Sequence, residues 1–241
     1  MYLKYLALLG MTSITLSLAG QEFLIKPYLQ NASPSSITIM WETSSGDEST
    51  VEWGLSEDLG NTTEGIAFDI NYTEARVHEV TLNALQKFTS YYYRVKTGDL
   101  VSDMYTFKTP PFGSDNRSFN MIAMSDMQID GRNPGKFREI INEGVFEYLK
   151  QELGEDVPEN LALVMIPGDL VGTGSNYSHW HDHFFGPSQP LFAEVPVYPV
   201  LGTMSRTQFS ISNISVYRKM VRQPMMNTGG TKTMAIPASL V

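Results

Sequence analysis

Cysteine is absent from the 241-residue sequence, which excludes disulfide bonds and thiol chemistry but does not exclude an exported protein. Basic residues are also few: the sequence has 17 Lys and Arg and 26 Asp and Glu, which gives a formal net charge of −9. This acidic balance argues against a nucleic-acid-binding surface. The chain is nevertheless 42% hydrophobic, and its length suffices for one large domain or two small ones with a real core.

The sequence also lacks a convincing membrane span. Its most apolar stretch, within residues 1–20, is too short and too rich in Ser and Thr to be one. Lys4 precedes this stretch, and small residues precede Gly20, as at a cleavage site. We therefore predict a signal peptide at residues 1–20, a secreted or periplasmic protein, and no stable membrane anchor after cleavage. The alternative is a buried first helix.

Residues 22–109 contain short runs in which apolar and polar residues alternate, separated by clusters of turn residues. Alternation with period two at this spacing predicts a β-sandwich. In the run at 36–41 the apolar positions include Trp41, which we expect in the core. The aromatic residues that can be placed alternate inward, so we predict a packing and positioning module. The alternative is a module whose exposed aromatics bind a polymer.

A proline-rich linker at residues 110–116 separates this region from an α/β pattern at 117–202. Apolar runs at 119–124 and 161–166 predict two parallel strands, the second buried on both faces. Between them, Asn133-Pro134 predicts the start of a crossover helix. The residues expected on its buried face are Phe137, Ile140, Ile141, Gly144, Val145, Tyr148 and Leu149.

A carboxylate follows each of these two strands. Asp126 follows the first and Asp169 follows the second, after the turn Pro167-Gly168. Because a β-α-β unit brings both strand ends to one edge of the sheet, the two carboxylates can share a pair of metal ions. The alternative is that each Asp only caps the turn or helix that follows it.

Short motifs follow the expected strands in a fixed order. They are Asp126-x-Gln128, Gly168-Asp169 and Val200-Leu201-Gly202. This series resembles that of the calcineurin-like metallophosphoesterases. The preceding sandwich resembles a fibronectin type III domain, with Tyr91 in the place of the corner tyrosine, and the combination is most similar to the purple acid phosphatase branch. The resemblance implies two domains, an all-β fibronectin III-like sandwich and an incomplete α/β metallophosphoesterase domain.

The resemblance also implies a function. Such enzymes hydrolyse phosphomonoesters through a metal-bound hydroxide, with two divalent or trivalent ions (Fe, Zn or Mn) neutralising the phosphate ester substrate. Asp169 would bridge both metals, Asp126 would bind the first, and Gln128 stands where many relatives have His. Purple enzymes have Tyr where this sequence has Gly172. A phosphodiesterase is the alternative activity, and a non-catalytic secreted binding module is the alternative class.

His179, His181 and His183 alternate along the chain. On a strand they would share a face and could bind zinc. However, residues 178–185 more closely fit the start of a helix, which would scatter the three rings. We expect the aromatic residues around them to pack against the helix that follows.

After Gly202 the resemblance stops, because the third motif should continue Asn-His-Glu and the sequence reads Thr203-Met204-Ser205. Restoring one base before the Thr203 codon permits the reading Asn-His-Glu. We therefore predict an out-of-frame tail at residues 203–241, with no catalytic residue retained and an inactive chain. The alternative is true divergence in a short pseudoenzyme.

Overall fold

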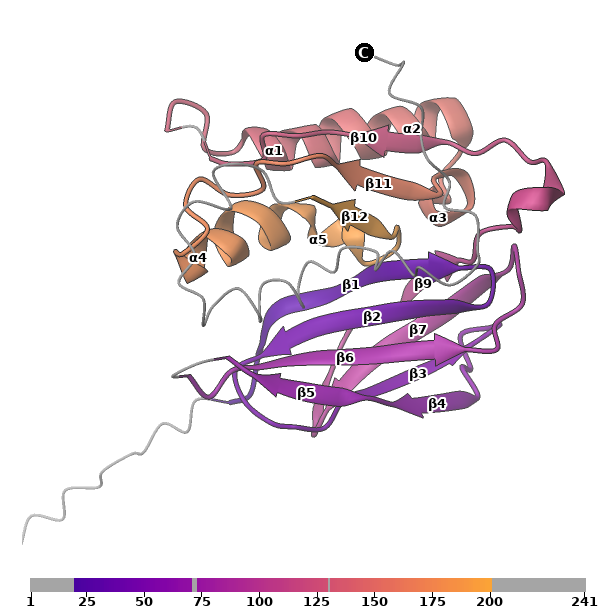
Figure 1. The fold of residues 1–241 in the computed structure, drawn as a ribbon, viewed down its shortest axis with the longest axis horizontal. Helices are drawn as coiled ribbons and strands as arrows, with labels where there is room; N and C mark the ends of the chain where they lie inside the picture. Colours follow the sequence, from indigo (N-terminus) through magenta and orange to yellow (C-terminus); the bar gives the residue numbers. More distant parts are fainter. Residues whose placement is uncertain (1–19, 71–72, 130, 201–241) are drawn as a thin grey trace, which may run out of the picture.

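The computed structural model describes residues 20–70, 73–129 and 131–200 (Figure 1). The predicted signal peptide, except for Gly20, lies outside this part of the chain. So do the tail predicted at 203–241 and the last two residues of the third motif. No helix within the described ranges has the length and apolar character needed to cross a membrane.

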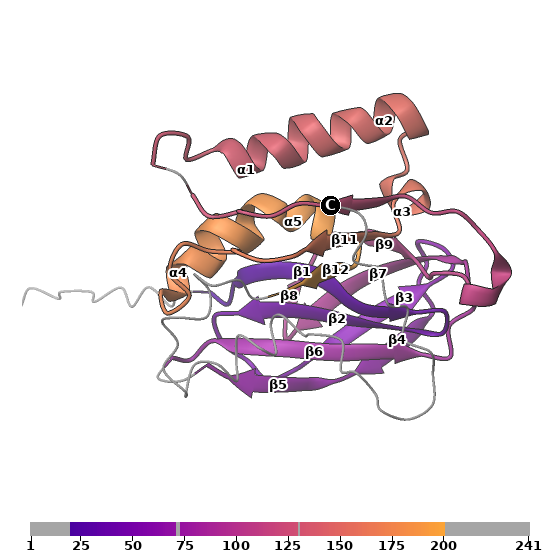
Figure 2. The same cartoon turned by 45° about the horizontal axis from the view of Figure 1, so that its top comes forward.

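An antiparallel β-sandwich forms the N-terminal part, as the alternating pattern predicts (Figures 1 and 2). One sheet has the order β1-β2-β6-β5, comprising β1 (Phe23–Ser33), β2 (Ser36–Thr43), β6 (Arg76–Asn83) and β5 (Ile66–Asp69). The other has the order β4-β3-β7-β8 with β9 also paired to β7, comprising β4 (Asn61–Glu64), β3 (Thr50–Gly54), β7 (Ser90–Thr97), β8 (Leu100–Val101) and β9 (Tyr105–Lys108).

The sandwich core follows from the period-two pattern of its strands. Ile37, Ile39 and Trp41 of β2 are fully buried between the sheets. Trp41 donates its indole N–H to the Thr97 hydroxyl, with 3.0 Å between Nε1 and Oγ1. The predicted corner tyrosine is confirmed, because the Tyr91 hydroxyl accepts the backbone N–H of Gln86 at 2.8 Å.

A small parallel sheet and helices form the C-terminal part of the described chain. The strands β10 (Met121–Ala123), β11 (Leu163–Ile166) and β12 (Val197–Pro199) lie in that order. A short 3₁₀ turn, η1 (Gly113–Asp115), lies between β9 and β10. Between β10 and β11 run α1 (Lys136–Glu139), the π-helix η2 (Ile140–Phe146), α2 (Glu147–Leu153) and α3 (Val157–Asn160). Between β11 and β12 run α4 (Tyr177–His179), the π-helix η3 (Trp180–Phe185) and α5 (Gly186–Phe192).

Two predictions about the first helix are wrong in detail. Backbone dihedrals remain helical from α1 through α2, but the helix begins at Lys136, because Asn133 and Pro134 lie in a preceding turn. Its buried face is also narrower than predicted, since Ile140 and Tyr148 are 43% and 61% exposed. Along α1, η2 and α2 the buried positions recur every four residues. The buried residues are Phe137, Ile141, Val145 and Leu149.

The prediction that the second strand is buried on both faces is also wrong. In β11, Val164 and Ile166 are fully buried, whereas Leu163 and Met165 are only partly covered. In the parallel order β10-β11-β12, both connecting helices lie on one side of the sheet, where α1 contacts α5 (Figures 1 and 2). Within the described residues the opposite side is therefore more open, and Met121 of β10 is 38% exposed there.

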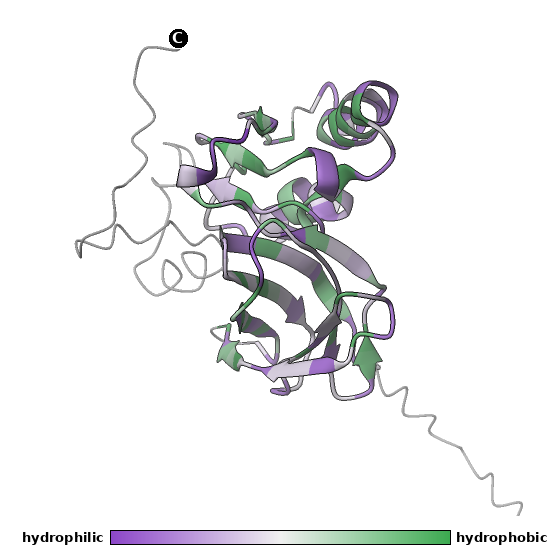
Figure 3. Ribbon diagram, turned by 90° about the vertical axis from the view of Figure 1, so that its right-hand side faces the viewer, coloured by the Kyte–Doolittle hydropathy of each residue, from purple (hydrophilic) through white to green (hydrophobic). Residues whose placement is uncertain are grey.

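The helix formed by α4, η3 and α5 connects the two parts of the molecule. It lies between the parallel sheet and the sheet that contains β1 and β2 (Figure 1). Its residue Phe184 belongs to one apolar cluster with Val164 of β11 and with Tyr28 and Met40 of the sandwich. Figure 3 shows hydrophobic (green) and hydrophilic (purple) stretches interspersed along the ribbon of both parts of the molecule. The second core of the molecule is therefore shared between both parts.

Candidate metal centre

Two loops at neighbouring strand ends carry the predicted carboxylates. Asp126 lies three residues beyond β10, and Asp169 lies three residues beyond β11. The backbone N–H of Met127 donates to the carbonyl oxygen of Asp169 at 3.0 Å. The fold therefore brings these two loops together, as the β-α-β pattern predicts.

Both aspartates adopt a backbone conformation that is unusual for non-glycine residues. Their φ angles are +62° for Asp126 and +49° for Asp169, and Gly168 before the latter has a φ of +148°. Such left-handed conformations cost free energy, and Asp tolerates them better than most residues. The Ser125 hydroxyl donates to Asp126 Oδ2 at 2.5 Å. The Asp126 side chain is exposed, whereas Asp169 is partly buried.

Gln128 is the third predicted ligand, and its side-chain oxygen is an unusual feature of the site. Gln128 Oε1 is buried and has no hydrogen-bond partner among the described residues. Leaving a buried acceptor unpaired costs roughly 1–3 kcal/mol. Gly172 lies beside it, since a Cβ on this glycine would be 3.8 Å from Gln128 Cβ. The position at which purple enzymes carry Tyr therefore faces this site but offers no side chain.

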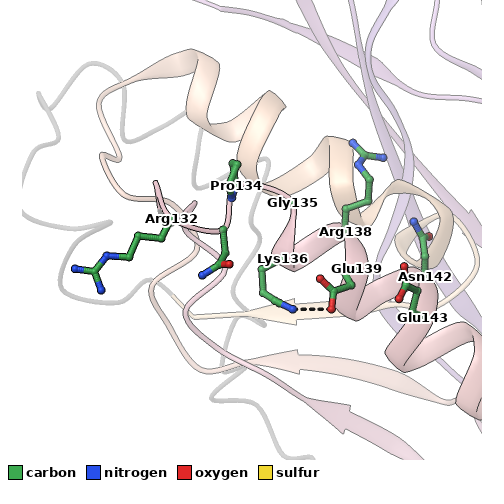
Figure 4. Close-up of a pocket in the computed structure, with 9 residues that line it drawn as sticks. Arg132, Pro134, Gly135, Lys136, Arg138, Glu139, Asn142 and Glu143 are labelled. Carbon is green, nitrogen blue, oxygen red and sulfur yellow. Dashed lines mark hydrogen bonds and ion pairs between the residues drawn. The ribbon is translucent and has the colours of Figure 1, made fainter.

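A cavity of about 170 Å³ adjoins Asp126 and Gln128. Phe137 and Ile140 of the first helix close its apolar side. A larger and more open depression of about 470 Å³ lies over the start of the same helix (Figure 4). Figure 4 shows Lys136 directed toward Glu139 there, and their charged groups are 2.6 Å apart. We place the candidate centre at the smaller cavity, because Asp126 and Gln128 line it, whereas neither lines the larger depression.

The described residues fit part of a metal site. Two carboxylates and an unpaired amide oxygen are hard donors of the kind that oxygen-preferring cations bind. No cluster of three or more His, Cys, Asp or Glu suited to a metal occurs between residues 20 and 200, apart from the undescribed positions. The third motif starts with Val200, directly after β12, and the N–H of Val200 donates to the Ile166 carbonyl at 2.7 Å. The other two residues of this motif, Leu201 and Gly202, lie outside the described residues.

The alternating histidines lie on a helix, as the sequence predicts. The rings of His179 and His183 are stacked with centroids 4.2 Å apart. His181 instead faces the sandwich, where its Nε2 lies 3.5 Å from Glu42 Oε2. The helix therefore separates the three rings, and they do not converge on one point.

Sequence reasoning missed a buried polar contact between the two parts of the chain. Glu42 of β2 is fully buried, and it contacts both His181 and Tyr177. The available signal was Met40, an apolar residue on the outward face of the same strand. An apolar residue there indicates that another element covers this face.

Comparisons with known proteins find a family similar to the sandwich. Residues 25–109 match the family described as the purple acid phosphatase N-terminal domain. The solved structure of PhoD matches with a TM-score of 0.52 at 13% identity, over 76% of this chain and 39% of PhoD. The chain thus spans well under two thirds of PhoD. A comparison with curated proteins found no match.

A smaller likeness involves the sensor domain of the anti-sigma factor RsgI4 from Pseudobacteroides cellulosolvens. The TM-score is 0.31 at 17% identity, over 40% of this chain and 100% of that domain. Residues 25–109 form a purple acid phosphatase-like N-terminal domain. The likeness to PhoD, at 13% identity, is one of fold.

Proposed function

We propose that the chain is the N-terminal portion of a secreted or periplasmic, metal-dependent phosphoric ester hydrolase. Its intact form would hydrolyse phosphomonoesters as an acid phosphatase-like enzyme. The main support is the contact between the Asp126 and Asp169 loops, beside the unpaired Gln128 oxygen. Ligands at adjacent strand ends of an open α/β sheet are the usual place for such a site.

In this proposal Asp126, Gln128 and Asp169 would hold the metal ions, which would be Fe, Zn or Mn. When bound, the ions would supply positive charge to a phosphate ester that otherwise repels nucleophiles. The residues of this chain would position that charge. Ser125 orients Asp126 through its hydrogen bond, and the left-handed backbone of Asp169 directs the second loop toward the first.

We further propose that the α/β part is incomplete and that this chain does not turn over substrate. The side of the parallel sheet on which Met121 is exposed has no covering layer among the described residues, which supports an incomplete α/β part. The departure from the family pattern at Thr203 supports an out-of-frame tail. The coding DNA tests this proposal. An alternate frame that stays open past the Val241 codon and encodes two further histidine motifs is expected, whereas an early stop codon would favour true divergence.

Metal titration tests the site itself. The purified chain should bind Mn²⁺, and Asp169→Asn should weaken binding at least tenfold, because a carboxylate at the loop contact would be lost. Gln128→His should retain or tighten binding, since imidazole is a stronger ligand than an amide. Asp99→Asn, in the exposed turn between β7 and β8, is the matched control. Equal binding by Asp169→Asn and Asp99→Asn would contradict the assignment.

A frame-repaired protein extends this test to activity. Asp169→Asn should abolish phosphatase activity, and Gln128→His should leave it intact. Comparing a phosphomonoester with a phosphodiester would separate the two candidate activities. Absence of metal binding in both the chain and the repaired protein would leave the non-catalytic binding module as the better interpretation.

A further inference from the structure

A carboxyl and an imidazole face each other across the contact between the sandwich and the helix at residues 177–192. Glu42 is fully buried, and its Oε1 accepts a hydrogen bond from the Tyr177 hydroxyl. Its Oε2 is buried and makes no hydrogen bond within the described residues. His181 Nε2, also buried and without a hydrogen bond there, lies 3.5 Å away. The two unpaired atoms therefore face each other across this contact.

Few other titratable groups share this contact. Tyr28 of β1 and Glu79 of β6 are buried nearby on the same sheet, and Asp182 follows His181 on the helix. Burial raises the pKa of Glu42 from 4.5 to about 9. Burial lowers the pKa of His181 below 6.5, while the neighbouring Asp182 raises it. Within the described part of the chain, the side chains that pair with Glu42 are Tyr177 and His181, and neither is a Lys or Arg that would balance its charge.

We propose that Glu42 and His181 share a single proton and act as a pH-sensitive latch that holds the helix at residues 177–192 on the sandwich. With one proton the pair is either neutral or an internal ion pair, and neither state leaves an isolated buried charge. With two protons or none, one buried charge has no counter-charge, which is costly. The latch is therefore stable only over a limited pH range.

Counting protons gives that range. In the unfolded chain Glu titrates near 4.5 and His near 6.5, so one proton remains between these values. The latched pair also holds one proton between pH 4.5 and 6.5, so the free energy that the latch contributes does not change with pH in this range. Above pH 6.5 the unfolded chain holds none, and the latch weakens as the pH rises until Glu42 ionises near 9. Below pH 4.5 the unfolded chain takes up a second proton, and the latch again weakens.

The latch lies close in sequence to the candidate metal centre. Tyr177 begins the helix eight residues after Asp169, and Trp180 donates its indole N–H to the Gly174 carbonyl at 2.9 Å. The helix thereby fixes the loop that begins at Asp169. We infer that opening of the latch moves this loop, a consequence that rests on the proposed function. The latch itself does not depend on it.

Hydrogen exchange of the full chain tests the latch without metal or substrate. Above pH 6.5 the opening equilibrium constant of the helix at residues 177–192, corrected for intrinsic exchange rates, should rise by up to about tenfold per pH unit. Glu42→Gln should abolish this slope, because Gln keeps the shape but cannot ionise. Glu64→Gln, an exposed change on β4, should retain it. A wild-type slope in Glu42→Gln would overturn the proposal.

Histidine variants test the shared proton more directly. In His181→Gln the unfolded chain loses its titrating imidazole, so weakening should begin near pH 4.5, about two pH units lower than in the wild type. His183→Gln, on the same helix but directed at His179, should keep the wild-type onset. An infrared carbonyl band of a protonated carboxyl at pH 7 that is lost in Glu42→Gln would show that the pair is in its neutral form, with the shared proton on Glu42. If the His181→Gln onset matches that of His183→Gln, the shared proton is excluded.

Failure of this proposal is distinguishable from failure of the proposed function. If the chain binds no Mn²⁺ but shows these pH slopes, the latch is supported and the metal centre is contradicted. If the chain binds Mn²⁺ but lacks the slopes, the metal centre is supported and the latch is contradicted.

Discussion

The sandwich and the parallel sheet differ in how each obtains a core. The sandwich encloses its own apolar cluster between two sheets, with residues such as Trp41 and Phe107 fully buried. The parallel sheet buries one face under two helices, and that core continues into the outer face of the sandwich through Tyr28 and Met40. The sandwich therefore supports the second part of the chain in addition to itself.

The difference has a simple physical origin. When two sheets pack face to face, each sheet buries the inner face of the other. A sandwich of this length therefore buries enough apolar surface to offset the conformational entropy that the chain loses on folding. Two of the three parallel strands, β10 and β12, have only three residues each. A sheet that short, covered on one side, needs the additional apolar contact that β1 and β2 provide.

The largest effect should come from separating the two parts. A fragment of residues 20–112 should fold and melt cooperatively by itself, because its core is internal. A fragment of residues 113–200 should not, because part of its core belongs to the sandwich. Circular dichroism during heating measures both, and limited proteolysis at residues 110–114 of the full chain should release a folded sandwich. Failure of residues 20–112 to fold would refute the asymmetry.

Matched phenylalanine truncations give a smaller, more local effect. Phe107→Ala in the sandwich core and Phe184→Ala in the shared core each remove a fully buried ring, at a cost of roughly 3–5 kcal/mol. Phe107→Ala should destabilise the whole chain. Phe184→Ala should loosen only the helices and the parallel sheet. Hydrogen exchange resolved by segment distinguishes them, and identical exchange patterns would mean one cooperative unit.

The smallest effect should come from the corner tyrosine. Tyr91→Phe removes the hydrogen bond to the Gln86 N–H and should reduce the free energy of unfolding of the sandwich by about 1 kcal/mol. The parallel sheet should be affected only through the sandwich. Urea unfolding of the 20–112 fragment measures the change. Tyr92→Phe, in the neighbouring and less buried position, is the control.

Sequence alone predicted much of this fold, and it did so where the determining interactions are local. The alternation at 36–41 specifies which residues of β2 face inward, so Trp41 was placed correctly. The order of strands, helix and Pro-Gly-Asp turn was enough to predict that the loops carrying Asp126 and Asp169 would lie together. The helix start was misplaced by a few residues because Asn133-Pro134 suits a turn as well as a cap.

Only the tertiary structure decided what covers each outer face. The alternation of apolar and polar residues along a strand shows which side chains point outward, but it does not show whether they meet water or another element. By this pattern Glu42 is indistinguishable from an ordinary surface carboxylate. It is buried because a helix more than 130 residues later in the chain packs on β2. The open side of the parallel sheet escaped prediction for the converse reason. Apolar residues such as Leu163 and Met165 indicate that a covering layer suits the strand, but only the arrangement of the crossovers determines whether one is present.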